Sequence, residues 1–195
     1  MLMLGLVAVG TLAANGAARL RFAALAFFGV ALAAQLIAGP ATSVWQATLS
    51  ATAALVCAAI LFIAARDGRY GEEPGWRLWV ATIVAAGTTA AAFAFLRTTS
   101  GEDVHLTPLG EDPSGLIRQA AAFWLLSSGV AILLTARGAV RGSLGALLML
   151  TGTQILVLLV PGPQLALALL LAWLQVVVAL AGAFLILNER ALRET

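Results

Sequence analysis

Residues 164–187 read QLALALLLAWLQVVVALAGAFLIL and contain no charged side chain. A helix needs about 20 mostly apolar residues to cross the hydrocarbon core of a bilayer, so this run is long enough to span a membrane. Comparable runs recur along the chain and predict helices at about 1–18, 20–39, 43–65, 77–96, 116–136, 142–160 and 164–187. The sequence therefore predicts an all-α, polytopic membrane protein with about seven transmembrane helices.

The composition excludes a water-soluble protein. Of the 195 residues, 62% are hydrophobic and 10% are charged. A soluble domain carries about 25% charged residues, so this chain lacks the charge needed to cover a water-exposed surface. Its basic residues are all arginine and are scattered among loops and helix ends, whereas a nucleic-acid-binding face is a clustered basic surface. We therefore expect the lipid bilayer, and no nucleic acid, as a partner.

The arginines also predict the orientation of the chain. With seven spans, one side of the membrane receives Arg97 and Arg118. The other side receives Arg19, Arg21, Arg66, Arg69, Arg77, Arg137, Arg141, Arg190 and Arg193. Because cytoplasmic loops are enriched in basic residues, we expect the C-terminus in the cytoplasm and the N-terminus outside. The abundance of Ala, Gly and Arg is typical of a GC-rich bacterial genome, so the expected location is the bacterial plasma membrane.

Two arginine-bearing turns resemble each other and suggest a tandem repeat. Residues 16–25 and 138–147 agree at five of ten aligned positions, and each is followed by a Pro/Gly turn and a further helix. The predicted layout is three helices, one linker helix and three helices: a first three-helix unit over 1–75, a linker helix with an outward acidic loop over 76–115, and a second three-helix unit over 116–195. The candidate contacts on the cytoplasmic turns are Arg19, Arg21, Arg137 and Arg141.

Polar residues inside the predicted helices are the candidates for function. A buried ionisable side chain would be the strongest candidate, because burial of a charge in a membrane is costly. All nine acidic residues and His105, however, fall in predicted loops or at the C-terminus, so we predict no catalytic, cofactor-binding or metal site. The neutral residues Thr151, Thr153, Gln154 and Gln175 form a candidate intramembrane polar path. The alternative is that these side chains only form hydrogen bonds between helices.

Residues 137–154, RGAVRGSLGALLMLTGTQ, carry a family resemblance. This stretch resembles the turn and second helix of the K subunit of respiratory complex I and its antiporter relatives, and more closely component E of hydrogenase-4-type complexes. The matching positions are Arg137, Arg141, Gly145, Leu148, Met149 and Gly152. The resemblance implies two K-like helix triplets joined by a linker helix. It also implies a non-redox, non-catalytic membrane subunit without a cofactor, whose partners are antiporter-like and redox-coupling membrane subunits.

The chain departs from this family where the family carries acidic residues. The second helix usually holds a buried carboxylate of the proton path, whereas residues 147–150 are all apolar here. Gln175 is the nearest match to a further acid in the third helix. The resemblance therefore implies a subunit that links parts of a membrane arm rather than one that conducts protons through its own carboxylates. A stand-alone small transporter or channel with parallel repeats is the alternative, and a membrane enzyme or enzyme anchor would need a cluster of His, Asp or Glu that the sequence does not show.

Overall fold

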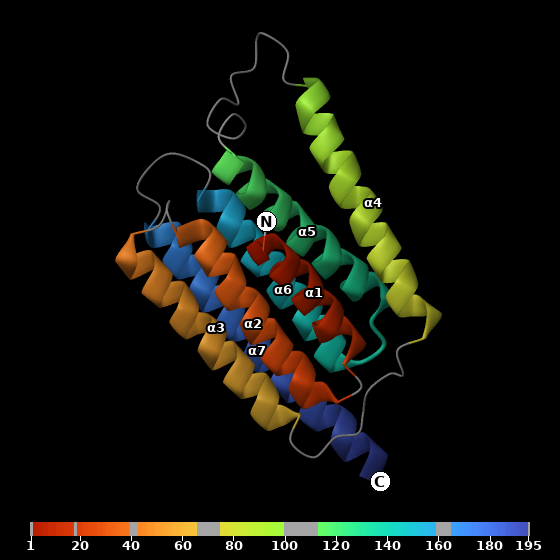
Figure 1. Cartoon of the computed structure of the whole chain (residues 1–195). Coiled ribbons are helices and arrows are strands. Elements are labelled where there is room, and N and C mark those ends of the chain that lie inside the picture. Colours follow the sequence, from red (N-terminus) through yellow and green to blue (C-terminus); the bar gives the residue numbers. More distant parts are fainter. Residues whose placement is uncertain are drawn as a thin grey trace.

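The computed structural model describes residues 2–17, 19–39, 43–65, 75–99, 113–158 and 165–194. These residues form seven helices and no strand, which confirms the predicted all-α fold (Figure 1). The helices are α1 (Leu2–Gly16), α2 (Leu20–Ala38), α3 (Val44–Ala64), α4 (Trp76–Thr99), α5 (Pro113–Thr135), α6 (Ala139–Leu158) and α7 (Leu165–Glu194).

Six of the helices, α2 to α7, are long and apolar enough to cross a membrane. The chain is therefore a polytopic integral membrane protein. The apolar helix α1 is shorter, with 15 residues. At 1.5 Å per residue its length is about 22 Å, less than the roughly 30 Å of a bilayer core.

The start of α6 and the end of α7 differ from the predicted boundaries. The amide of Gly142 donates to the carbonyl of Gly138 at 3.1 Å, so α6 begins at Ala139 and not at residue 142. Arg141 therefore lies in the first turn of α6, and Arg21 lies in the first turn of α2, rather than in the connecting turns. Helix α7 continues to Glu194, beyond the predicted end at 187, because its polar last turns consist mostly of good helix formers.

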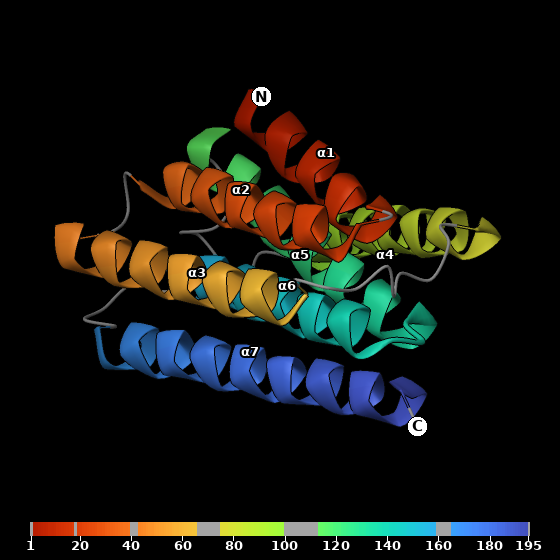
Figure 2. The ribbon, with the colours of Figure 1, turned by 90° about the horizontal axis from the view of Figure 1, so that it is seen from below.

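The helices form two packed layers. One layer contains α1, α2 and α3, and the other contains α5, α6 and α7 (Figures 1 and 2). Between the layers α1 contacts α5, α2 contacts α6 and α3 contacts α7, so each helix packs on the one that follows it four places later. Helix α4 lies at the edge of the bundle against α5 (Figure 1). Because helices four places apart run in the same direction, these three pairs are parallel.

The core lies between the layers and around α6. Its largest fully buried apolar side chains are Phe27 of α2, Leu61 of α3, Leu125 of α5, and Leu144, Leu147, Leu148 and Ile155 of α6. No residue of α6 is fully exposed. The least buried stripe of this helix follows the helical repeat along Gly142, Ala146, Leu150, Thr153 and Val157.

Glycines set the distance between α5 and α6. A Cβ atom on Gly145 would lie 2.9 Å from the carbonyl oxygen of Gly129, and one on Gly152 would lie 2.9 Å from that of Ala122. Lipid tails are as apolar as leucine, so close van der Waals packing has to supply much of the attraction between helices in a membrane. The glycines make that packing possible by letting the two backbones approach.

Polar side chains satisfy backbone groups at two of the helix ends. Ser43 and Gln46 form a capping box at the start of α3, which gives Gln46 a local structural role. Arg118 of α5 donates through Nε to the carbonyl oxygen of Ile37, near the end of α2, at 3.2 Å. Such an arginine satisfies a carbonyl that the helix itself leaves without a donor.

Candidate functional site

Three of the four predicted path residues meet at the contact of α6 with α7. Gln175 of α7 donates through Nε2 to Thr151 Oγ1 at 3.2 Å, and the same nitrogen lies 3.4 Å from Gln154 Oε1. The three residues are at most 6% exposed. Thr151 and Gln154 are three positions apart on one face of α6, which explains why both reach Gln175. We call these three residues the glutamine cluster.

The fourth predicted residue, Thr153, does not join the glutamine cluster. Its hydroxyl donates to the carbonyl of Met149 on its own helix at 2.9 Å. Thr153 follows Thr151 by two positions, which is more than half a turn of helix. Its side chain therefore lies on the opposite, less buried face of α6. For Thr153 the hydrogen bond is within a helix, so it links neither helices nor a polar path.

The glutamine cluster leaves hydrogen-bonding capacity unused. Among the described residues, Gln154 Nε2 and Gln175 Oε1 are buried without a partner, and so is Gln35 Oε1 on α2. Each primary amide offers two donors and an acceptor oxygen, so a free donor and a free acceptor coexist in the cluster. Its groups are neutral and cannot exchange a proton by titration. The cluster can bind water or another polar group, and it can transmit a hydrogen bond.

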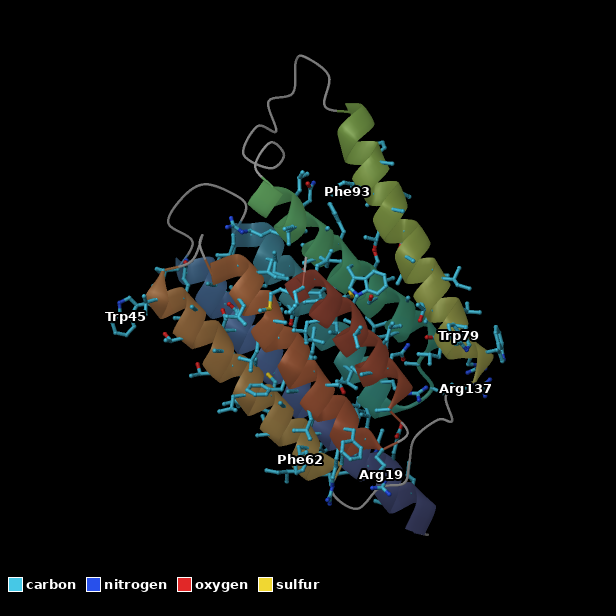
Figure 3. The ribbon with its side chains drawn as sticks, viewed as in Figure 1. Arg19, Trp45, Phe62, Trp79, Phe93 and Arg137 are labelled. Carbon is cyan, nitrogen blue, oxygen red and sulfur yellow. The ribbon has the colours of Figure 1, made fainter. Side chains whose placement is uncertain are left out.

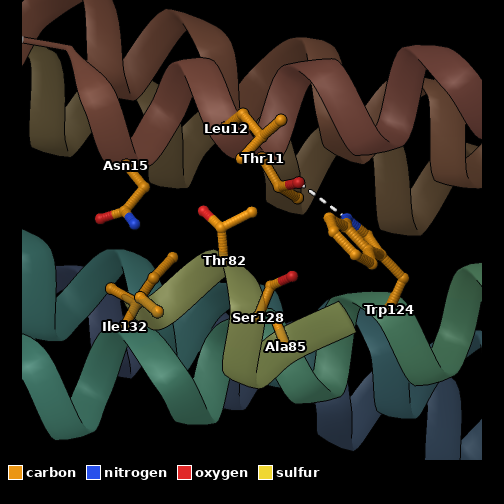
Figure 4. Close-up of a pocket in the computed structure, with 9 residues that line it drawn as sticks. Thr11, Leu12, Asn15, Thr82, Ala85, Trp124, Ser128 and Ile132 are labelled. Carbon is orange, nitrogen blue, oxygen red and sulfur yellow. Dashed lines mark hydrogen bonds between the residues drawn. The ribbon is translucent and has the colours of Figure 1, made fainter. Parts of the chain in front are cut away.

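A second polar site lies between α1, α4 and α5 and was not predicted from the sequence. Figure 4 shows a small cavity whose polar lining comes from Thr11 and Asn15 of α1, Thr82 of α4, and Trp124 and Ser128 of α5. About 10 Å³ of the cavity is open to a water-sized molecule, which is enough for about one water. Leu12, Ala81, Ala85 and Ile132 complete the lining.

A chain of hydrogen bonds organises this cavity. Trp124 donates through Nε1 to Thr11 Oγ1 at 2.8 Å, drawn as the dashed line in Figure 4, and Thr11 donates to the carbonyl of Ala8 at 2.8 Å. Thr82 donates to the carbonyl of Leu78, also at 2.8 Å. The sequence signal for this site was an asparagine inside an apolar run and a tryptophan at mid-helix. By contrast, Trp45 and Trp79 project outward from the bundle, as interfacial tryptophans do (Figure 3).

The four candidate turn arginines lie at or next to helix ends. The guanidinium of Arg19, just before α2, lies 6.0 Å from the ring centre of Phe22 on that helix. That of Arg21 lies 5.5 Å from the ring centre of Phe62 on α3. Arg137 is exposed in the connection between α5 and α6, and Arg141 is half-buried on α6. At the same end, Glu189 of α7 accepts a hydrogen bond through Oε1 from the amide of Ala139 at 3.1 Å.

Within the described ranges, no three His, Cys, Asp or Glu side chains gather closely enough to hold a metal ion. His105 and the acidic loop around it lie outside those ranges. No protein-family model, no curated protein and no solved structure matches this chain.

Proposed function

We propose that this chain is a non-redox membrane subunit of a complex-I-related respiratory assembly, of the group 4 hydrogenase or antiporter type. In that assembly it bridges antiporter-like, ion-translocating subunits and the subunit that couples to the redox arm. The resemblance of residues 137–154 to component E of hydrogenase-4-type complexes suggests this role. The corresponding orientation is an N-terminus outside and a C-terminus in the cytoplasm of a bacterium.

One structural observation carries most of the support: each helix of the first triplet packs against its counterpart in the second. Because the corresponding helices of the two triplets lie side by side and run parallel, a sideways shift relates the second triplet to the first. A rotation that closes the two units into a ring does not. A repeat of this kind is open-ended, as in head-to-tail assemblies, and leaves an outer face on each triplet. Such a module suits a position between two other membrane subunits.

The interior of the bundle supports a linking role rather than a conducting one. The stretch 147–150, where the family carries a carboxylate, is apolar, and both Leu147 and Leu148 are fully buried in the core. The glutamine cluster is neutral and hydrogen-bonded within the chain. Any proton transfer through the assembly then relies on titratable groups of the partners.

The decisive experiment is purification of the tagged chain from its native membrane in a mild detergent, followed by mass spectrometry. We expect antiporter-like and redox-coupling subunits in amounts equal to the tagged chain. Recovery of the chain alone, as a folded homo-oligomer, would contradict the proposal. That result would favour the stand-alone transporter, in which the two triplets act as parallel repeats around a central site.

Variants on the two outer faces sharpen this experiment. A Cβ atom at Gly29 of α2 or at Gly142 of α6 would meet no heavy atom within 4 Å, so we expect Gly29→Leu and Gly142→Leu to fold, which the thermal unfolding of each variant checks. A lost contact of about 1.4 kcal/mol lowers the affinity for the partner on that face about tenfold. Gly87→Leu on α4 is equally open and serves as the matched control. Partner yields that stay unchanged in both outer-face variants would argue against a bridging position.

A further inference from the structure

A groove separates the start of α4 from the end of α5 on the arginine-rich side of the protein. It is lined by Trp76, Arg77 and Val80 of α4, by Leu134 and Thr135 of α5, and by Arg137 just after α5, and its volume is about 350 Å³. It is distinct from the polar cavity of Figure 4, which lies between α4, α5 and α1. Neither the proposed function nor the family resemblance uses this groove.

The groove is cationic at its mouth and apolar along its walls. Arg77 of α4 and Arg137 of the connection between α5 and α6 both line the groove. Among the described side chains, the one carboxylate is that of Glu189, which accepts from the amide of Ala139. The side chains of Val80 and Leu134 are 37% and 78% exposed, so they present an apolar surface to the bilayer.

The depth of the groove corresponds to the headgroup level of a membrane. Trp76 and Trp79 begin α4 and are about 70% exposed, at 71% and 69%. Exposed tryptophans at a helix end are typical of the membrane–water interface. The first turn of α4 adds backbone amides without intrahelical partners, and these favour an anion. Guanidinium groups bind phosphate through two parallel hydrogen bonds, which a single lysine cannot do.

We propose that this groove is a binding site for an anionic phospholipid. The phosphate lies between Arg77 and Arg137, and one acyl chain follows Val80 and Leu134 along the helices. The lipid fills the space between the start of α4 and the end of α5, beside the direct contact of the two helices. Within the described side chains of α4, the buried ones are Ala81 and Ala85, which pack with Ala131, and Thr89 reaches the carbonyl of Phe123 only at 3.5 Å.

The test uses the full chain in mild detergent, titrated with phosphatidylglycerol and, separately, with phosphatidylcholine of the same acyl chains. Native mass spectrometry counts the lipids that stay bound, and thermal unfolding measures the stabilisation. We expect phosphatidylglycerol to be retained and to raise the Tm, and phosphatidylcholine to do neither. The Arg77→Gln/Arg137→Gln variant should bind phosphatidylglycerol about 30-fold more weakly. Each arginine contributes about 1 kcal/mol to the binding of an anionic headgroup, and the variant lacks both.

Two further measurements make the assignment specific. Arg19→Gln/Arg21→Gln removes the same charge from the same end of the protein but outside the groove, and we expect it to retain the lipid. A phosphatidylglycerol with a photoreactive acyl chain should label peptides of α4 and α5. Equal loss of lipid in both double variants, or labelling spread over all helices, would overturn the proposal in favour of general attraction to a basic surface. Binding that appears only after Glu72→Gln/Glu73→Gln would also overturn it, because the arginines would then be neutralised within the chain.

Discussion

Gln175 Nε2 and Gln154 Oε1 lie 3.4 Å apart across the contact of α7 with α6, while the other polar atom of each amide has no partner among the described residues. The same Gln175 nitrogen is 3.2 Å from Thr151 Oγ1. Both glutamine side chains are buried, so each amide relies on the other for a hydrogen-bond partner across the contact of α6 with α7.

Replacement of both glutamines should cost less than the sum of the two single replacements. Gln175→Leu leaves the Gln154 amide buried with no partner on α7, and Gln154→Leu removes one acceptor from Gln175. We expect each single variant to lower the free energy of unfolding by about 1 kcal/mol, and the double variant to lose less than the sum. Equilibrium unfolding in mixed micelles measures all three values. Thr153→Val is the control, since its hydroxyl bonds within its own helix; strict additivity of the two glutamine variants would refute the coupling.

The glycines of the α5–α6 contact should tolerate no methyl group. The added Cβ of Gly129→Ala would lie 2.6 Å from the carbonyl oxygen of Gly145, and that of Gly145→Ala would lie 2.9 Å from the carbonyl oxygen of Gly129. Because these neighbours are backbone atoms, the helices must separate, and we expect a loss of about 1–3 kcal/mol. Gly142→Ala on the same helix meets no atom within 4 Å and should be neutral or slightly stabilising. Equal stability of Gly142→Ala and Gly145→Ala would show that α5 and α6 do not approach in this way.

The hydrogen bond from Trp124 to Thr11 should be part of what holds α1 on α5. Trp124→Phe removes the donor, and Thr11→Val removes the acceptor from the 2.8 Å contact. Each change is expected to lower the free energy of unfolding by about 0.5–1.5 kcal/mol, and the double variant should lose less than the sum. Thr11→Ser keeps the hydroxyl and should behave like the parent chain in thermal unfolding. A Thr11→Ser variant as unstable as Thr11→Val would assign the effect to packing of the threonine methyl.

Glu189 should stabilise the start of α6. Its carboxylate accepts from the amide of Ala139, the first residue of that helix, at 3.1 Å. A carboxylate near a helix N-terminus contributes about 0.3–1 kcal/mol, so Glu189→Ala should lower the Tm, whereas Glu189→Gln keeps an acceptor oxygen and should lose less. Salt screens such charge interactions at an exposed end of a helix. The difference between Glu189→Ala and Glu189→Gln should therefore shrink at high ionic strength, and a salt-independent difference would point to packing instead.

Much of the architecture could be predicted because membrane helices are encoded locally. The helices predicted at 20–39 and 43–65 agree with α2 and α3 within about a residue at each end, since Pro, Gly and Ser bound them. The predicted and observed boundaries differ where residues at the helix ends suit both helix and turn. The repeat predicts Arg21 and Arg141 in turns, but each lies in the first turn of its helix. The start of α3 is also marked locally, because the spacing of Ser43 and Gln46 is that of a capping box.

The sequence by itself determined that this chain crosses a membrane with a bundle of helices, because insertion depends on the length and apolarity of each segment. It also named Thr151, Gln154 and Gln175 as polar residues inside those segments. Only the tertiary structure decided that these three meet, that Thr153 turns back to its own helix, and that Trp124 reaches Thr11 across 113 positions of sequence. Those contacts depend on which helices become neighbours and on the rotation of each about its axis, and both follow from close packing between segments that are distant in the sequence.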